Sequence, residues 1–252
     1  MVVGGSERER TRALRELAHA AWTFQLWTGK RPPFGAVLLR TSEKLPSVTG
    51  RAGQWTLVFD PQEQEQVERT LPAATTTNAS VKLTPPTATA YDDGDLSHEV
   101  CHRYVAWLAM AARRPAPVPD MINEAAAISC EPATMREKRL RTARPQSEAP
   151  TPAEILTTRN PLSVDGALIA RLDAEAKQNG SSVVNFVIDP SDKLSDAVAA
   201  FYTKSTLLQG RARSNAGRGG LRVFEILITQ AQGNTPATRR ALSGLLGKGQ
   251  TP

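Results

Sequence analysis

Two of the three histidines in this 252-residue chain, His98 and His102, stand four positions apart, and Glu99 directly follows the first. On a helix, residues at positions i and i+4 lie on one face about a turn apart, so both imidazoles can bind one metal ion. The H-E-x-x-H spacing is typical of zinc sites in which the glutamate takes a proton from metal-activated water. The pattern predicts a hydrolytic Zn²⁺ site with His98 and His102 as ligands and Glu99 as general base.

A third ligand is needed, because catalytic zinc normally has three protein ligands and an open fourth position. Asn123 and Glu124 open an alanine-rich segment, and Glu124 lies 22 residues after His102 (124 − 102 = 22). With the H-E-x-x-H set, this Asn-Glu pair resembles the thermolysin-like (gluzincin) metallopeptidases over about residues 95–130. The resemblance implies that Glu124 completes a His₂Glu zinc site supported by Asn123, and that the substrate is a peptide or protein. The ImmA/IrrE-like peptidases, which also join H-E-x-x-H to a glutamate on the next helix, are the second choice.

The sequence departs from the thermolysin-like pattern near the motif. Arg103 follows the second histidine, where the family prefers an uncharged residue. Ile128 stands four residues after Glu124, where thermolysin-like members have an aspartate that orients a histidine. The orienting group must then come from elsewhere in the chain. Three aspartates are candidates that the sequence does not separate: Asp165, Asp173 and Asp189.

Two further questions stay open at this level. The tetrahedral intermediate of peptide hydrolysis needs a hydrogen-bond donor, for which His19, Tyr202 and the arginines are candidates. The chain has two cysteines, Cys101 and Cys130, and Cys130 could instead join the two histidines in a closed structural metal site. Two cysteines do not form a disulfide framework, and the N-terminus lacks a signal-peptide pattern, so a cytoplasmic location is expected.

The segments around the motif have the patterns needed to position it. Apolar residues recur at helical spacing over residues 6–27, and residues 96–112 are apolar on more than one face, as in a buried helix. Residues 34–40 and 54–59 are predicted strands, with a weaker one at 79–83. These elements predict an α+β fold in which residues 1–134 form a zincin-like catalytic domain (helix, small sheet, H-E-x-x-H helix, Glu helix).

The remainder is predicted to form a linker and a second domain. Residues 135–161 are basic and then proline-rich, which is typical of a tether. Residues 162–252 are predicted to form a small α/β domain in which a right-handed crossover joins two parallel strands. Its expected elements are helices at 164–177, 192–208 and 236–246, strands at 182–188 and 221–229, and a glycine-rich loop at 209–220.

The net positive charge of the chain is consistent with one alternative function. The net charge is +6 and the isoelectric point is near 9.6, while no apolar run is long enough to cross a membrane. The alternative prediction is a basic nucleic-acid-binding or assembly protein, such as a coat or nucleocapsid subunit, in which H-E-x-x-H is coincidental and His102 packs beside Tyr104 or Val105. Phosphate groups would then contact segments 135–144 and 211–222, the second through Arg211, Arg213, Arg218 and Arg222.

Overall fold

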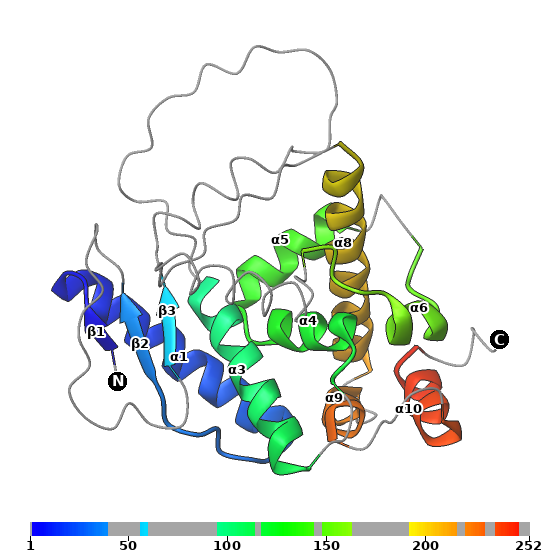
Figure 1. Ribbon diagram of the computed structural model, residues 1–252, viewed down its shortest axis with the longest axis horizontal. Coiled ribbons are helices and arrows are strands. Elements are labelled where there is room, and N and C mark those ends of the chain that lie inside the picture. Colours follow the sequence, from blue (N-terminus) through cyan, green and yellow to red (C-terminus); the bar gives the residue numbers. More distant parts are fainter. Residues whose placement is uncertain are drawn as a thin grey trace, which may run out of the picture.

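The structure, a computed structural model, describes residues 2–39, 56–59, 95–113, 117–143, 148–162, 192–215, 220–229 and 235–246. Within these residues the chain is mostly helical, and a small sheet lies at one end (Figure 1). None of the described helices is both long enough and apolar enough to span a membrane. Several predicted features lie outside the described residues: the strands at 79–83 and 182–188, the helix at 164–177, and Asp165, Asp173, Asp189 and Arg218.

The small sheet has three parallel strands. Strand β2 (Ala36–Leu39) pairs with β1 (Val2–Gly4) on one side and with β3 (Thr56–Phe59) on the other. Parallel neighbours need a long connection, and helix α1 (Glu7–Thr28) lies between β1 and β2 in the chain. The strands predicted at 34–40 and 54–59 are therefore present in shorter form, whereas β1 was not predicted.

The bounds of helix α1 match the helix predicted at 6–27 to within one residue, but its apolar face differs from the predicted one. Leu14 and Trp22, two residues of the predicted apolar pattern, are 52% and 62% exposed. A capping box starts it: the Ser6 hydroxyl accepts a hydrogen bond from Glu9 N, and the Glu9 carboxylate accepts one from Ser6 N. Gly29 ends it with a φ of 68°, a left-handed conformation that suits glycine. Its buried apolar residues recur at helical spacing and face the core: Ala13, Ala20, Phe24 and Trp27.

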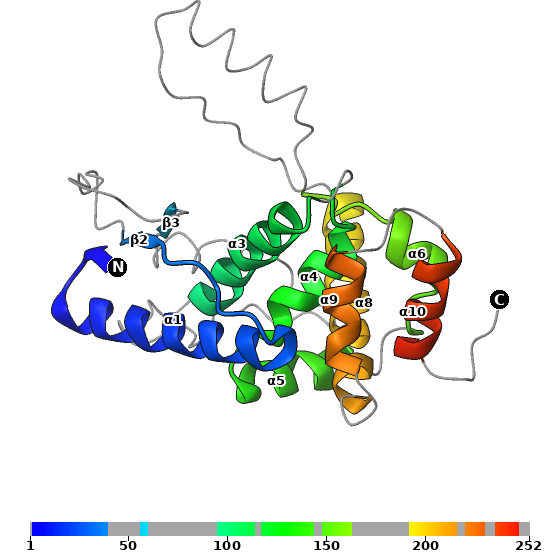
Figure 2. The same cartoon turned by 90° about the horizontal axis from the view of Figure 1, so that it is seen from below.

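The two helices that carry the predicted ligands pack against each other. Helix α3 (Asp95–Ala111) contains His98 and His102, and α4 (Asp120–Ser129) contains Glu124. Helix α3 also packs against α1, where the buried Glu16 carboxylate accepts a hydrogen bond from Ser97 N at 3.2 Å. This bond satisfies an N–H group in the first turn of α3, which has no partner within its own helix. Figure 2 shows α4 between α3 and the later helix α8.

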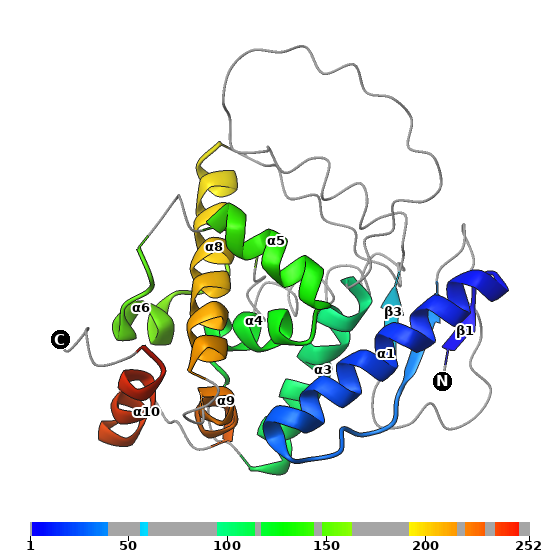
Figure 3. The same ribbon diagram turned by 180° about the vertical axis from the view of Figure 1, so that it is seen from behind.

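The C-terminal half packs directly onto α4. Helix α8 (Asp192–Ser214) contacts α4 and α5 (Ala133–Ala143), and Figure 3 shows α5 and α8 crossing in front of α4. Gly210 allows the close approach of α8 to α5, because a Cβ atom there would lie 2.9 Å from Leu140 Cδ1. Helices α6 (Pro152–Thr157), α9 (Gly220–Thr229) and α10 (Pro236–Leu246) complete the described fold.

Two predictions for the C-terminal half need correction. The strand predicted at 221–229 is helix α9, so the predicted parallel crossover is wrong. The glycine-rich loop predicted at 209–220 is helical as far as Ser214, at the end of α8. The segment 135–161, predicted as a linker, includes most of α5 and all of α6. The domain boundaries at residues 134 and 161 remain predictions.

Candidate metal centre

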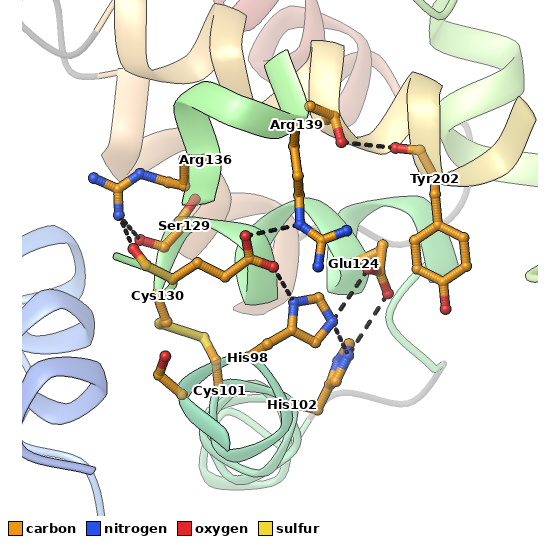
Figure 4. Close-up of polar contacts among 12 residues, drawn as sticks. His98, Cys101, His102, Glu124, Ser129, Cys130, Arg136, Arg139 and Tyr202 are labelled. Carbon is orange, nitrogen blue, oxygen red and sulfur yellow. Dashed lines mark hydrogen bonds and ion pairs between the residues drawn. A yellow bond between two sulfur atoms is a disulfide. The ribbon is translucent and has the colours of Figure 1, made fainter. Parts of the chain in front are cut away.

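The two histidines of the H-E-x-x-H set face a common point. His98 is buried on α3, and His102 follows one turn later and is half-buried. Their Nε2 atoms lie 3.2 Å apart, and their ring planes meet at 80° (Figure 4). Each Nε2 can supply one lone pair to a metal ion. The prediction that His102 packs beside Tyr104 or Val105 in a purely structural role does not explain this mutual orientation.

Glu124 reaches the same point from α4. Its Oε1 lies 3.2 Å from His98 Nε2, and its Oε2 lies 3.6 Å from His102 Nε2. The residue is 3% exposed, and within the described residues its buried Oε1 has a hydrogen-bond donor only when His98 Nε2 carries a proton. A buried carboxylate oxygen without a hydrogen bond is costly unless a cation neutralises it. The structure thus brings together the three residues predicted as ligands.

The spacing of these donor atoms fits a tetrahedral metal site. With metal–ligand distances of about 2.0–2.1 Å, two ligands of a tetrahedral ion stand about 3.3 Å apart. Two separations of 3.2 Å are close to this value, from His98 Nε2 to His102 Nε2 and from His98 Nε2 to Glu124 Oε1. His102 Nε2 lies 3.6 Å from the other carboxylate oxygen, Oε2. Glu99 lies next to the two histidines: the potential ligand atoms of His98, Glu99 and His102 all lie within 4.8 Å of one another. This group could hold a metal ion.

Two hydrogen bonds orient the histidine rings. His98 Nδ1 lies 2.8 Å from Glu131 Oε1, and His102 Nδ1 lies 3.1 Å from Asn123 Oδ1. Both oxygens are acceptors, so each Nδ1 carries the proton and donates it. In the neutral ring this leaves the Nε2 lone pair directed at the common point, which is the usual arrangement for a histidine ligand. Asn123 thus has the supporting position predicted for it.

Glu131 is the orienting group that the sequence analysis missed. It follows α4 in the turn before α5, is fully buried, and accepts a hydrogen bond from Arg139 Nε at 2.9 Å. Arg136 donates to the main-chain oxygens of Ser129 and Glu131, which fixes this turn. Glu131 stands seven residues after Glu124 (131 − 124 = 7), beyond the end of α4 at Ser129. Helical spacing along α4 therefore does not place it beside His98, and only the packing of the turn after α4 against α3 does so.

The charges of the site are strongly coupled. Burial alone would lower the pKa of His98, but the carboxylates of Glu124 and Glu131 outweigh burial and hold that pKa well above 6.5. For His102, burial and then the charge of His98 lower the pKa. For Glu124, burial alone would raise the pKa, but His98, His102 and Arg139 lower it. In the metal-free chain, one proton on His98 therefore compensates the buried carboxylates.

Tyr202 from α8 lies beside this cluster. Figure 4 shows its ring near Glu124, on the opposite side of the site from Cys101. Burial, followed by the charges of Glu124 and Glu99, raises the pKa of Tyr202 to about 12. The phenol is therefore a hydrogen-bond donor at neutral pH. His19, the other single residue predicted for such a role, instead contacts the main-chain oxygen of Glu131 at 3.3 Å.

Cys101 and Cys130 form a disulfide, which corrects one prediction. The bond joins α3, between the two histidines, to the residue that follows α4, with a Cα–Cα distance of 6.2 Å. Such a distance lies within the usual range for a disulfide. Cys130 therefore has no free thiolate for the alternative closed metal site with His98 and His102. The cysteine count alone could not show that α3 and α4 bring the two side chains together.

The predicted phosphate contacts do not lie on one loop. Arg211 and Arg213 belong to the last turn of α8, while Arg222 is exposed on α9. In the other basic segment, Arg136 and Arg139 contact the turn after α4, as described above. The positive charges of Arg136 and Arg139 are therefore engaged in contacts within the protein.

Comparisons with known proteins supply no family for this chain. No protein-family model, curated protein or solved structure matches it significantly. The geometry of the chain's own residues is therefore the basis for inferring a function.

Proposed function

We propose that this chain is a zinc-dependent peptide hydrolase in which His98, His102 and Glu124 bind the metal ion. The observation that carries the proposal is the convergence of two imidazole Nε2 atoms and one buried carboxylate, at separations of 3.2 to 3.6 Å. Without a cation, two neutral imidazoles and a carboxylate would direct only lone pairs at one another. A proton on His98 satisfies part of this set, whereas a divalent cation satisfies all of it.

The donor set favours zinc among common divalent ions. Magnesium and calcium prefer sites made of oxygen atoms, whereas imidazole suits zinc and its neighbours in the first transition row. Two histidines and one glutamate leave a fourth tetrahedral position open, as catalytic zinc sites do. Bound zinc would supply a Lewis acid that polarises a carbonyl oxygen and acidifies water.

Glu99 is the general base in this proposal. Its carboxylate lies within 4.8 Å of the ligand atoms of both histidines, and its side chain is half-buried rather than enclosed. It can therefore meet a water molecule that enters from solvent and take a proton from it as the water attacks the peptide carbonyl. The same carboxyl group can then pass that proton to the departing amine.

Tyr202 is the candidate donor to the oxyanion of the tetrahedral intermediate. Its phenol stays protonated at neutral pH because its pKa is about 12, and its ring lies beside Glu124. A fixed donor of this kind typically contributes about 10²–10³-fold in rate. Tyr202→Phe should therefore lower kcat by roughly that factor and leave zinc content unchanged.

The basic-protein alternative makes an opposite prediction. It needs no metal, and it expects nucleic acid to copurify with the chain and to dissociate as salt rises. Arg136 and Arg139 contribute less to such a surface, since both contact the turn after α4. Metal content and nucleic-acid content of one preparation therefore separate the two functions.

The test uses the full-length protein in three forms: wild type, Glu99→Gln, and Glu137→Gln as a matched control on the exposed face of α5. Zinc is measured by elemental analysis, and cleavage of a mixed peptide pool is measured by mass spectrometry. We expect one equivalent of zinc in all three proteins, and cleavage by all but Glu99→Gln. Loss of the general base should lower the rate by about 10²–10⁴-fold.

Two outcomes would overturn the proposal at different points. A wild-type protein that binds no zinc when zinc is supplied would remove the metal centre itself. A protein that binds one zinc ion but cleaves no peptide, or that cleaves equally well as Glu99→Gln, would keep the metal centre and remove the hydrolytic role.

A further inference from the structure

A cavity of about 230 Å³ lies between α5 and α8, beside the metal centre. Arg139 and Tyr202 line both: they form part of the cavity wall, and the charge of Glu124 acts on each of them. Arg139 is further tied to the centre through Glu131, which orients His98. A peptide bound at the metal centre could therefore place a neighbouring group of its own into this cavity.

The cavity wall combines basic with apolar and hydroxyl-bearing residues. Lys138 and Arg139 supply two positive charges, and none of the lining residues is acidic. Glu131 accepts the Nε–H of Arg139, which leaves the terminal NH₂ groups of that guanidinium for a further acceptor. The other lining residues carry no charge: Met135, Thr142, Ala143, Tyr202, Thr203 and Thr206.

The size of the cavity limits what can enter it. Pockets that bury drug-sized ligands measure about 300–1,000 Å³, so a cavity of about 230 Å³ suits a single side chain or chain end. Arginine and lysine together select for a carboxylate, because guanidinium donors match its two oxygens and form hydrogen bonds strengthened by charge. The apolar residues of the wall suit the methylene groups next to such a carboxylate.

We infer that this cavity is a substrate subsite for a carboxylate, supplied by an acidic side chain near the cleaved bond or by the C-terminus of the peptide. The inference rests on the proposed peptide hydrolysis, and it adds a substrate preference to it. Lys138 is the contact to change, rather than Arg139, because Arg139 also holds Glu131, which orients His98.

The test compares peptides that differ by one charge. A cleaved peptide from the mixed pool is resynthesised with Glu or Gln at each position near the cut, and with a free or amidated C-terminus. The kcat/KM of each pair is measured at low salt for the wild type, for Lys138→Glu, and for Arg141→Glu. Arg141 is the matched control because it is an exposed residue of α5 outside the cavity wall.

We expect the wild type to prefer one acidic peptide over its neutral partner by roughly tenfold, the lower end for a hydrogen bond between charged groups. The preference should disappear in Lys138→Glu and persist in Arg141→Glu. A preference confined to Glu over Gln identifies an acidic side chain as the ligand, and one confined to the free acid over the amide identifies the C-terminus. A wild type without any preference, or a preference that Lys138→Glu retains, would overturn the inference.

Binding measured without cleavage separates this inference from the proposed function. Fluorescein-labelled acidic and neutral peptides are titrated with zinc-loaded Glu99→Gln, alone and combined with Lys138→Glu, and anisotropy is recorded. Selective binding of acidic peptides that depends on Lys138 supports the subsite even if no peptide is cleaved. Equal binding of acidic and neutral peptides rejects the subsite even if cleavage is found.

Discussion

Helix α3 has two sides that pack in different ways. Toward α1 it buries Tyr104, whose ring lies 5.3 Å from that of Phe24, and Phe24 also contacts Trp27 at 4.9 Å. Toward α4 it presents His98 and His102, whose polar atoms lie within about a hydrogen-bond distance of the groups that face them. Apart from the hydrogen bond between Ser97 and Glu16, the first side is an aromatic and aliphatic core. Apart from the Cys101–Cys130 disulfide, the second is a buried polar network.

The two sides of α3 differ in the kind of contact that stabilises them. Dispersion and burial of apolar area are non-directional, so the side facing α1 depends on volume and hydrophobicity. The polar side is directional, because each buried donor or acceptor needs a partner at the correct position. We therefore expect substitutions on the first side to change stability, and substitutions on the second to change metal affinity. Each prediction below tests that separation.

The largest effect is expected for Phe24→Ala, on the side facing α1. Phe24 is fully buried, and truncation of a buried phenylalanine typically costs about 3–5 kcal/mol of unfolding free energy. Urea unfolding followed by circular dichroism measures this loss. Zinc bound per folded molecule should stay at one equivalent, and a folded variant that lost its zinc would show that the two sides are not separate.

The next largest effect is expected for His102→Ala, on the polar side. Zinc binding by four-ligand sites is worth about 10–16 kcal/mol, so one ligand is worth about 3–4 kcal/mol, or roughly 100–1,000-fold in Kd. A competition titration with a fluorescent zinc chelator measures this change. The metal-free variant should unfold within about 1 kcal/mol of the wild type, because His102 is half-buried and its loss creates little cavity. Destabilisation as large as that of Phe24→Ala would contradict the separation.

The elements of the fold that the sequence predicted are those with strong local signals. Helix α1 has a capping box and a periodic apolar face, and α10 begins at Pro236, a residue favoured in the first turn. These signals act within one helix, so they predict that helix independently of what packs around it. The same holds for the predicted helices that became α3, α4 and α8.

Helix α9 shows where local signals fail. The run from Leu221 to Thr229 is rich in apolar and branched residues, and a short run of this kind does not distinguish a strand from a buried helix. In the structure Phe224, Leu227 and Ile228 are fully buried, at the i, i+3, i+4 spacing of a helix, while Ile226 is exposed. The packing of α9 against its neighbouring helices, among them α1, α8 and α10, decides between the two structures.

The residues of the site also fall into two groups, those that local spacing predicts and those that depend on packing between segments. The spacing of His98 and His102 on one helix is local, so it was predicted together with Glu99. Glu131 and the disulfide depend on how α4 and the turn after it pack against α3, and nothing within either segment alone reveals that contact. The meeting of Glu124 with the two histidines was expected from family resemblance, and the structure places them together. That a metal ion binds there remains a prediction.

A smaller effect is expected for Glu131→Gln, which keeps the shape of the group that orients His98 and removes its charge. Loss of such an outer partner typically weakens metal affinity by about 10–100-fold. The chelator titration measures this, and Glu137→Gln on the exposed face of α5 is the matched control. Affinity equal to that of the control would mean that the contact between Glu131 and His98, 2.8 Å long, does not tune the metal site.

The smallest effect is expected from pH. Raising the pH should lower the stability of the metal-free protein but strengthen zinc binding. The folded pKa of metal-free His98 lies well above 6.5, because Glu124 and Glu131 outweigh burial. The stability that its proton contributes is therefore complete below about pH 6.5 and is lost as pH rises through the folded value. Zinc must displace this proton, so the apparent Kd should tighten up to about tenfold per pH unit over the same interval.

Thermal unfolding from about pH 6.5 to about pH 8.5, with either EDTA or excess zinc, tests this linkage. With EDTA the midpoint should fall as pH rises, since the unfolded chain releases the His98 proton more easily than the folded one. With zinc the stabilisation relative to EDTA should grow, because a metal ion replaces the proton between the same carboxylates. Parallel pH profiles in the two conditions would mean that proton and metal do not compete for His98. The polar side of α3 would then lack the coupling that distinguishes it from the apolar side.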